Sequence, residues 1–308
     1  MPCFSIIIPV YNKVNFIENT LQSVFQQSFT DYEIILINDG STDDSESKIL
    51  TFNDPRIHYY SKKNEGVSET RNLGIEKAKS EFVTFLDADD YWYPNFLEEM
   101  FLLIKKFPEQ SVFSAAIEIE NTKTVIPSSY SIEKINDNVI VNYFEASHKE
   151  SVLFTSCAVF HKNVFEKVGK FDPLIKSGQD TDLWIRIGLI YPIVFSFKIL
   201  TRYIYDPNSL SKKKSFMNSK MYFSKFSDQE KKNLALKKFL DLNRFSLAIK
   251  SKMYGDDSGF KKYTVDIDLK NLTYKKRILL NLPGILLKFL LKVNLILVQV
   301  GWSKSVFK

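Results

Sequence analysis

The strongest constraint in this sequence is a short apolar run near its amino terminus, residues 4–10 (FSIIIPV). A strand this apolar does not alternate between a buried and a solvated face, so it is expected to be covered on both faces, as in a parallel sheet. Further short runs at 33–37, 57–60 and 82–86 are separated by segments whose apolar residues recur at helical spacing. Strands that alternate with helices predict an α/β fold with a doubly wound sheet, whose ligands bind beyond the carboxyl ends of the strands.

The same periodicity places the other elements. Helices are predicted over 14–27, up to about residue 52, over 68–78 and from about residue 180, and further strands over 111–120 and 152–160. Polar turns that follow a strand and precede a helix occur at 9–12, 38–40, 64–66 and 87–89. The connectivity brings these turns to one edge of the sheet, where they are expected to make one site.

The run at 82–86 ends abruptly in three carboxylates, Asp87, Asp89 and Asp90. Carboxylates crowded at the end of a buried strand raise one another's pKa unless a positive charge is near, and a divalent cation supplies that charge. An Asp-x-Asp pattern offers the oxygen ligands that Mg²⁺ or Mn²⁺ prefers, while water and substrate phosphates take the other positions. The alternative for a single such pattern is a solvated acidic turn that caps the next helix.

Composition and charge restrict the function further. The 308 residues, of which 44% are hydrophobic, are enough for one large domain and an appendage. Cys3 and Cys157 are too few for a disulfide framework, and residues 1–10 do not resemble a signal peptide, so a cytoplasmic protein is expected. Residues 1–200 carry 19 Lys and Arg against 28 Asp and Glu, whereas residues 201–308 carry 23 against 8. The basic last third predicts an anionic partner, or else it is a solvated helical surface.

With its motifs in this order, the chain resembles the family two glycosyltransferases of the GT-A fold, which are inverting enzymes that use nucleotide sugars. The motifs are 5–12 (SIIIPVYN), 38–43 (NDGSTD), 64–74 (NEGVSETRNLG), 86–90 (LDADD) and 178–184 (GQDTDLW). The resemblance covers about residues 4–211. It implies a Rossmann-like, doubly wound mixed sheet over residues 1–215, with a nucleotide-sugar-binding half at 1–104 and an acceptor-binding half at 105–215.

The resemblance also assigns roles in donor binding. Pro9, Tyr11 and Asp39 match residues that hold the nucleobase, with the acid accepting a hydrogen bond from an imide N–H, which implies a UDP-sugar or a dTDP-sugar. Arg71 matches an arginine near the nucleotide sugar. The N–H groups of its planar guanidinium suit a phosphate or a neighbouring carboxylate. Alternatively, Arg71 is a surface residue of its helix that pairs with Glu65 or Asp39.

The remaining roles concern the metal and the reaction. Asp87 and Asp89, with Ala88 between them in the donor site, match the family's metal pair, and Asp89 is expected to contact Mn²⁺ or Mg²⁺ directly. Asp180 matches the general base that removes the proton of the acceptor hydroxyl. Alternatively, Asp180 and Asp182 only complement the dipole of the helix that begins there.

Two positions depart from the family pattern. Gln179 stands where relatives usually have Glu, so one acid is lost beside the expected base. Asp206 stands near the place of a family histidine in the loop over the diphosphate, and Lys212, Lys213 and Lys214 are candidates for the lost positive charge.

The last part of the chain, residues 216–308, is basic and is predicted to be helical. Its most apolar stretch, 278–300, is interrupted by Pro283, Lys288 and Lys292 and is too short in uncharged residues to cross a bilayer. Treated as one helix, it has a narrow polar stripe, which is typical of a helix that lies in an anionic membrane surface. A helix packed on its own domain, or on a second copy in a homodimer, is the alternative.

Two functions from different classes follow. The first is an inverting, metal-dependent glycosyltransferase that acts at the inner face of the cell membrane on a lipid-linked or cell-surface polysaccharide precursor. The second is a non-catalytic nucleotide-sugar or glycan-binding protein that keeps the fold, which Gln179 and Asp206 favour. A nucleic-acid partner is not expected, because the basic third lacks any recognised motif for one.

Overall fold

The computed structural model describes residues 1–120, 124–134, 136–204 and 223–299. The strands are β1 (Phe4–Val10), β2 (Tyr32–Asn38), β3 (Ile57–Ser61), β4 (Phe82–Phe85), β5 (Tyr91–Trp92), β6 (Val112–Glu120), β7 (Val125–Pro127), β8 (Asn138–Val141), β9 (Ala158–His161) and β10 (Ile193–Ile204). The helices are α1 (Ile17–Phe25), α2 (Ser45–Ile49), α3 (Val67–Lys77), α4 (Phe96–Lys106), α5 (Tyr143–Ala146), α6 (Asn163–Val168), α7 (Gln179–Gly188), α8 (Ser227–Lys232), α9 (Leu234–Tyr254), α10 (Asp257–Thr264), α11 (Tyr274–Asn281) and α12 (Gly284–Gln299). Short 3₁₀ turns lie at Thr155–Cys157, Phe223–Phe226 and Leu269–Asn271.

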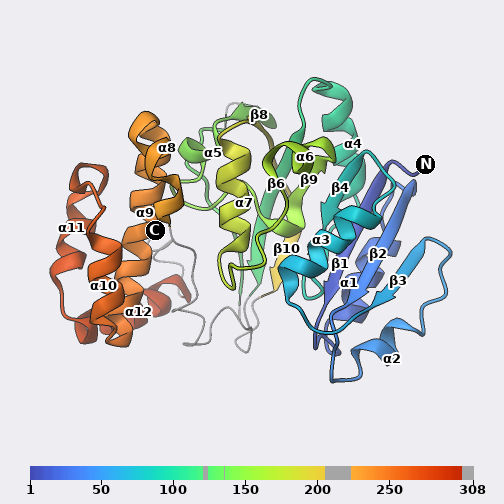
Figure 1. The fold of residues 1–308 in the computed structure, drawn as a ribbon, viewed down its shortest axis with the longest axis horizontal. Coiled ribbons are helices and arrows are strands. Elements are labelled where there is room, and N and C mark those ends of the chain that lie inside the picture. The colour runs from blue at the N-terminus through green and yellow to red at the C-terminus, as the bar shows by residue number, and fades with distance from the viewer. Residues whose placement is uncertain (121–123, 135, 205–222, 300–308) are drawn as a thin grey trace.

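The described strands form a mixed sheet with the order β3-β2-β1-β4-β9-β6-β10-β5, and β7 and β8 pair with β6 and β10. Strands β1, β2, β3 and β4 are parallel to their neighbours, whereas β9 is antiparallel to both β4 and β6. The expected fold class is therefore confirmed, including the helical extension, whose helices α8–α12 lie at the end of the molecule opposite β3 (Figure 1).

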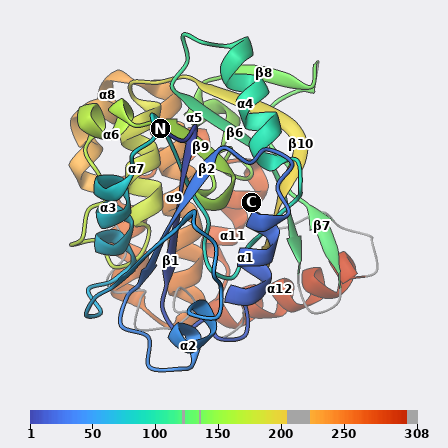
Figure 2. The same ribbon diagram turned by 90° about the vertical axis from the view of Figure 1, so that its right-hand side faces the viewer.

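Two layers of helices cover the sheet (Figure 2). Ile6 and Ile8 of β1 pack in a core with residues of α1 and α4, and Ile7 packs on the other face with residues of α3, α6 and α7. All seven residues of β1 are buried. This two-sided burial explains why the strand is a continuous apolar run.

Gly74 explains how closely α3 approaches the sheet. A Cβ at this position would lie 2.3 Å from Cγ2 of Ile7, so only a residue without a side chain fits between the helix and β1. Gly66, which precedes α3, has a φ of 95°, a conformation that residues with a Cβ rarely adopt. Both glycines therefore have structural roles, Gly66 in the turn and Gly74 in the packing of α3 on the sheet.

Two element predictions are wrong in part. The helix predicted from residue 14 begins at Ile17, because residues 13–16 form a turn in which the N–H groups of Phe16 and Ile17 bond to the carbonyl of Lys13. The strand predicted over 152–160 is extended only at Ala158–His161. Residues 155–157 before it form a 3₁₀ turn, whose contacts with the acidic turn are described below.

Helix α9 joins the carboxyl-terminal helices to the domain that contains the sheet. Its first half contributes Leu236 and Phe239 to the core on the α7 side of the sheet, whereas its second half contributes Phe245 and Ile249 to a separate core with α11 and α12. The predicted boundary at residue 215 lies outside the described residues, as do Asp206 and Lys212, Lys213 and Lys214. The predicted division at residue 104 falls inside α4, and strands from both sides of it enter the one sheet.

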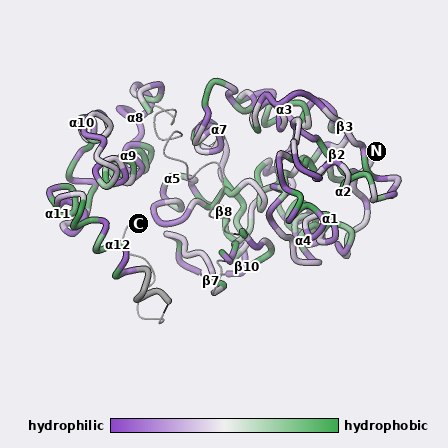
Figure 3. Tube along the Cα trace, turned by 90° about the horizontal axis from the view of Figure 1, so that it is seen from below, coloured by the Kyte–Doolittle hydropathy of each residue, from purple (hydrophilic) through white to green (hydrophobic). Residues whose placement is uncertain are grey.

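The apolar stretch at 278–300 is not one helix. Pro283 lacks a backbone N–H and separates α11 from α12, so Asn281 and Lys288 do not share one continuous polar stripe. Across the described residues, the helices lack the combination of length and apolar character that crossing a membrane requires. Apolar residues nevertheless recur along α12 and in the segment before it (Figure 3).

Candidate active site

The turns after β1 and β2 are joined by hydrogen bonds, as the topology predicts. Asn12 has a left-handed backbone, with a φ of 52°, and its Oδ1 accepts a hydrogen bond from the N–H of Thr42 at 2.7 Å. The N–H of Lys13 donates to Oγ of Ser45, also at 2.7 Å. These bonds fix the backbone before α1, from which the Lys13 side chain reaches the acidic turn.

Each acid of the Asp-x-Asp pair is matched by a cation. Nη2 of Arg71, on α3, lies 2.5 Å from Oδ1 of Asp87, and Nζ of Lys13 lies 2.5 Å from Oδ2 of Asp89. The guanidinium of Arg71 also lies over the ring of Phe171, at 5.2 Å from its centroid. The turns after β1, β3 and β4 therefore meet in one charged cluster.

Arg71 retains hydrogen-bonding capacity. Its side chain is 5% exposed, and its Nε and Nη1 are buried without a hydrogen-bond partner among the described residues. The alternative pairing of Arg71 with Glu65 or Asp39 is not found there, because both of those acids bind Lys62 instead. Buried donors without a partner are costly, so an anion that reached these nitrogen atoms would be stabilised.

Two buried hydroxyl groups hold the acidic turn in shape. Oγ of Ser156 donates to Asp90 at 2.5 Å and accepts from the N–H of Asp87 at 3.1 Å. The hydroxyl of Thr20 donates to the carbonyl oxygens of Ala88 and Asp90, at 3.0 and 2.9 Å. Asp90 therefore points into the protein, and Asp87 and Asp89 remain as the two acids with cationic neighbours at the sheet edge. Ser156 was not predicted as a site residue, because no motif contains it.

The acids of this turn influence one another as predicted. Burial, followed by the charges of Asp87 and Asp89, raises the pKa of Asp90 well above its ordinary value. Burial also raises the pKa of Asp89, and Asp87 adds to the effect, whereas the ammonium of Lys13 opposes it. A further positive charge at this edge would be stabilised.

The residues of the acidic turn fit a divalent cation that binds together with a nucleotide diphosphate. In the described parts of the chain, no group of three or more His, Cys, Asp and Glu side chains has the arrangement of a metal site. Mg²⁺ and Mn²⁺ bound with a diphosphate need only one or two protein carboxylates. Asp87 and Asp89 would supply these hard oxygen atoms.

Asp39 is buried where β2 ends and already accepts three hydrogen bonds. Its Oδ1 accepts from Nζ of Lys62 at 2.6 Å and from the N–H of Glu65, and its Oδ2 accepts from the N–H of Gly66 at 2.9 Å. A carboxylate has about four acceptor positions, so about one remains for a nucleobase. Pro9 is buried in β1 and Tyr11 follows it, half-buried. The nucleobase roles of these residues stay predictions.

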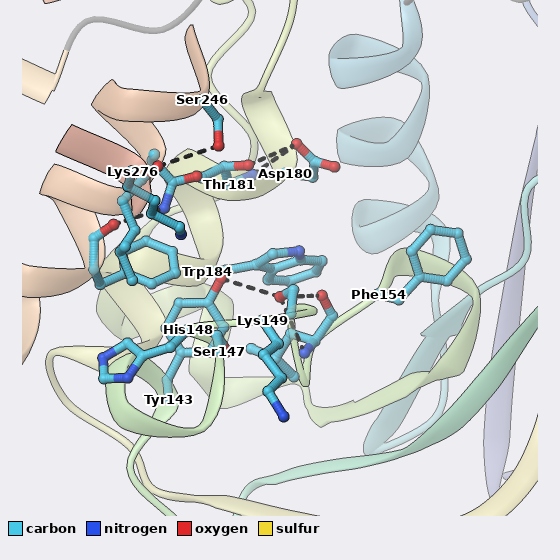
Figure 4. Close-up of a pocket in the computed structure, with 15 residues that line it drawn as sticks. Tyr143, Ser147, His148, Lys149, Phe154, Asp180, Thr181, Trp184, Ser246 and Lys276 are labelled. Carbon is cyan, nitrogen blue, oxygen red and sulfur yellow. Dashed lines mark hydrogen bonds between the residues drawn. The ribbon is translucent and has the colours of Figure 1, made fainter. Parts of the chain in front are cut away.

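Asp180 lies in the first turn of α7, as expected. Gly178 precedes this helix with a φ of 85°, and Oδ1 of Asp180 accepts a hydrogen bond from the N–H of Thr181 at 2.7 Å. Asp180 and Thr181 line a cavity of about 190 Å³ (Figure 4). The carboxylate is half-buried, so a ligand in this cavity can reach it.

Asp182 has a different environment from that of Asp180. It is fully buried, accepts a hydrogen bond from Nε of Arg186 at 3.0 Å and forms an ion pair with Lys225. Asp182 therefore anchors α7 to the segment before α8 and is not available to a substrate.

The segment that leads to α7 is fixed to α3. The side-chain amide of Asn72, the residue after Arg71, exchanges hydrogen bonds with the backbone of Phe171 at 2.9 and 3.0 Å. In the described part of the structure, no hydrogen bond or ion pair joins Asp180 directly to Asp87 or Asp89. The expected base and the acidic turn are thus connected through Arg71, Asn72 and Phe171.

This sheet, with an acidic turn at the carboxyl end of β4, is the arrangement of GT-A-like glycosyltransferases. The sequence matches the Glycosyl transferase family 2 domain over residues 5–169, more than half of the 308 residues. The chain belongs to this family.

Similar proteins agree with this assignment. An uncharacterised glycosyltransferase of Rickettsia typhi is 32% identical over 65% of this chain and 63% of its own length. Glycosyltransferase GlyA of Streptococcus pneumoniae is 29% identical over 68% of this chain and 31% of its own length. The chain thus spans less than two thirds of these relatives.

The solved structure of S. aureus TarS residues 1–349 in complex with UDP-GlcNAc superposes with a TM-score of 0.60. The match covers 85% of this chain and 90% of that one, at 18% identity. At this identity the likeness shows the fold.

Proposed function

We propose that this protein is an inverting glycosyltransferase that moves a sugar from a UDP-sugar or dTDP-sugar to a hydroxyl group of a lipid-linked or cell-surface glycan precursor. The observation that carries the proposal is the cluster of Arg71, Asp87, Lys13 and Asp89, in which two N–H groups of a buried arginine lack partners in the described structure. Such groups suit the diphosphate of a nucleotide sugar. TarS, which shares the fold, has been solved with UDP and with UDP-GlcNAc.

The residues divide the reaction between two places. At the sheet edge, Arg71 and Lys13 would bind the diphosphate and oppose the negative charge that develops on it as the glycosidic bond breaks. A divalent cation held by Asp87 and Asp89 would supply further electrostatic stabilisation of this leaving group. At the start of α7, Asp180 would accept the proton of the acceptor hydroxyl as its oxygen attacks the anomeric carbon from the opposite face. A single displacement of this kind inverts the anomeric centre.

The test is a panel of nucleotide sugars with Mn²⁺, with Mg²⁺ and with a chelator. Release of UDP or dTDP that depends on the cation, and a product whose anomeric configuration is opposite to that of the donor in NMR spectra, are expected. Donor binding without any release or transfer would favour the non-catalytic nucleotide-sugar-binding protein instead. Release that persists unchanged in the chelator would contradict the role of the cation.

We also propose that α12 binds the anionic inner surface of a cell membrane, which places the enzyme near lipid-linked acceptors. Ile285 and Phe289 stand one helical turn apart and are 86% and 59% exposed. Lys288 and Lys292 are exposed on the same helix. Residues 201–308 as a whole carry 23 Lys and Arg against 8 Asp and Glu. Exposed apolar side chains among lysines match the chemistry of an anionic lipid surface, where apolar groups enter the interface and lysines reach the headgroups.

A further inference from the structure

The cavity beside Asp180 is built jointly by the catalytic domain and the carboxyl-terminal helices. The segment from α5 to Phe154 forms one wall, α7 forms another, and α9 and α11 close the remaining side (Figure 4). Helix α9 presents one face to the cavity through residues at helical spacing, Phe239, Leu242, Asn243 and Ser246. A helix outside the matched family domain therefore shapes the space around the expected catalytic base.

The charge of this cavity is mainly positive. Two lysines, Lys149 and Lys276, line it together with His148, whose lowered pKa favours the neutral imidazole, and Asp180 is the one carboxylate among its lining residues in the described structure. No ion pair with an acid is found for Lys149 or Lys276 within the described residues. The ammonium group of Lys276 lies 5.2 Å from the ring centroid of Phe245.

Burial and neighbouring charges support this description of the field. Burial lowers the pKa of Lys276. Burial also lowers the pKa of His148, with further contributions from Lys238 and Lys276, whereas Glu145 opposes this effect. Nε2 of His148 is also buried without a hydrogen-bond partner in the described part of the chain. An anionic group near these residues would offset the repulsion and satisfy polar groups that the protein leaves unpaired.

We infer that this cavity binds the acceptor, and that the acceptor carries an anionic group, a carboxylate or a phosphate, which Lys276 and Lys149 recognise while Asp180 contacts its reacting hydroxyl. The inference rests on the proposed transferase function and names the substrate class for the same site. The donor diphosphate is not the expected occupant, because Arg71 and Lys13 lie at the sheet edge with the acidic turn. The hydroxyl groups of Thr181 and Ser246 and the amide of Asn243 are the polar partners available for sugar hydroxyls.

Direct binding tests the inference without requiring turnover. Glucose, glucuronic acid and glucose 6-phosphate are compared as probes by ligand-observed NMR on the full chain, with excess UDP present to fill the donor site. One or both anionic probes are expected to bind about tenfold more tightly than glucose, as charge-assisted hydrogen bonds predict. The two anionic probes distinguish a carboxylate from a phosphate. Equal binding of all three sugars would overturn the inference.

Matched variants locate the binding. Lys276→Met and Lys149→Met, on opposite walls of the cavity, are each expected to lower the affinity for the anionic probe to about that for glucose. Lys275→Met removes an exposed lysine one residue away that does not line the cavity, so it should bind both probes as the parent does. Thermal unfolding checks that each variant is folded, and Lys149, being exposed, keeps the test valid if Lys276→Met unfolds. Identical losses in the Lys275 and Lys276 variants would contradict a site in this cavity.

The outcomes separate this inference from the proposed function. If the parent releases no UDP from any donor yet binds the anionic probe through Lys276, the transferase proposal fails and the anion site stands. If it releases UDP but does not discriminate between the probes, the transferase proposal stands and the anionic acceptor is wrong.

Discussion

The two ends of this molecule use charge in opposite ways. At the sheet end, Asp87 and Asp89 pair with Arg71 and Lys13 in one buried or half-buried network. At the other end, the lysines of α12 lie exposed beside exposed apolar side chains. Charges that pair with one another inside the protein hold side chains in a fixed arrangement. Exposed charges instead attract partners of opposite charge outside the chain. Changes at the sheet end are therefore expected to cause large losses of activity or of ligand affinity. Changes at α12 are expected to cause only a modest loss of membrane binding.

The largest loss is expected from Asp180→Asn. General-base assistance contributes about 10²–10⁴-fold, so transfer should fall by about that factor, whereas donor affinity should change little because Asp180 has no bond to the acidic turn in the described structure. Steady-state transfer rates and the dissociation constant for the donor, measured side by side, check this expectation. Transfer close to that of the parent would rule out Asp180 as the base.

Asp182→Asn is the matched comparison, two residues further along α7. Asp182 is fully buried with Arg186 and Lys225, so its loss leaves two cations without their carboxylate. A lower melting temperature is expected, with transfer per folded molecule close to the parental value. The reverse pattern, in which Asp182→Asn abolishes transfer in a stable protein, would move the base role to Asp182.

Asp89→Asn should have the next largest effect. A neutral amide is a poorer ligand for a hard cation and leaves the diphosphate charge less opposed, so activity should fall by about 10²–10³-fold, the usual effect of removing one such electrostatic group. Mn²⁺ affinity, measured by titration in the presence of UDP, should fall as well. Asp90→Asn is the control, because Asp90 is buried against Ser156 and should retain the cation dependence of the parent. Unchanged Mn²⁺ affinity in Asp89→Asn would contradict the metal assignment.

Asp39→Ala is expected to weaken donor binding by about tenfold, the effect of one charge-assisted hydrogen bond, with a smaller change in the turnover rate. The nucleobase does not take part in bond breaking, so its binding contributes equally before and during the reaction. Lys62→Met removes the same ion pair but keeps the carboxylate, so it controls for the loss of local structure. Equal affinity of the parent for UDP and ADP would be incompatible with the role of Asp39.

The contrast between the ends also explains what the sequence could predict of the fold. Strands β1 and β2 lie within a residue of their predicted bounds, because strands buried in a parallel sheet need nearly continuous apolar runs. Residues 152–157 were predicted wrongly as strand, because an apolar composition does not distinguish a strand from a buried turn. The turn is set by contacts of Ser156 with Asp90 and Asp87, which lie 66 and 69 residues away in sequence.

The site was predictable to the extent that its residues belong to motifs. The turns that carry Asp39, Arg71 and Asp87 are brought to one edge by connectivity alone, and the structure confirms that these turns meet there. The pairing of Lys13 with Asp89 was not predicted, because the two residues are 76 positions apart and a lysine in a helix-start turn is common. The cavity beside Asp180 was not predictable either, because α9 and α11 reach it only through tertiary packing.

The smallest effect expected is at α12, and it tests whether the exposed end acts on a membrane. Replacing both Ile285 and Phe289 with Ser should weaken binding to vesicles that contain anionic lipid by about tenfold, since burial of each apolar side chain contributes about 1.5–3 kcal/mol when complete and less at an interface. Val265→Ser is the control, because Val265 is also exposed, at 77%, but lies after α10.

Vesicle sedimentation at low and high salt measures the effect, and attraction of the lysines to the headgroups should make binding weaker at high salt. Transfer to a water-soluble acceptor should remain parental in the double variant, because α12 does not line the cavity or the acidic turn. If the double variant binds vesicles as well as Val265→Ser does, the exposed face of α12 does not bind the membrane. If the parent instead forms a dimer that the double variant does not, the face belongs to a second copy of the chain. Either result would show that exposed charge at this end serves a different partner, while the predictions for the buried network at the sheet edge would stand unchanged.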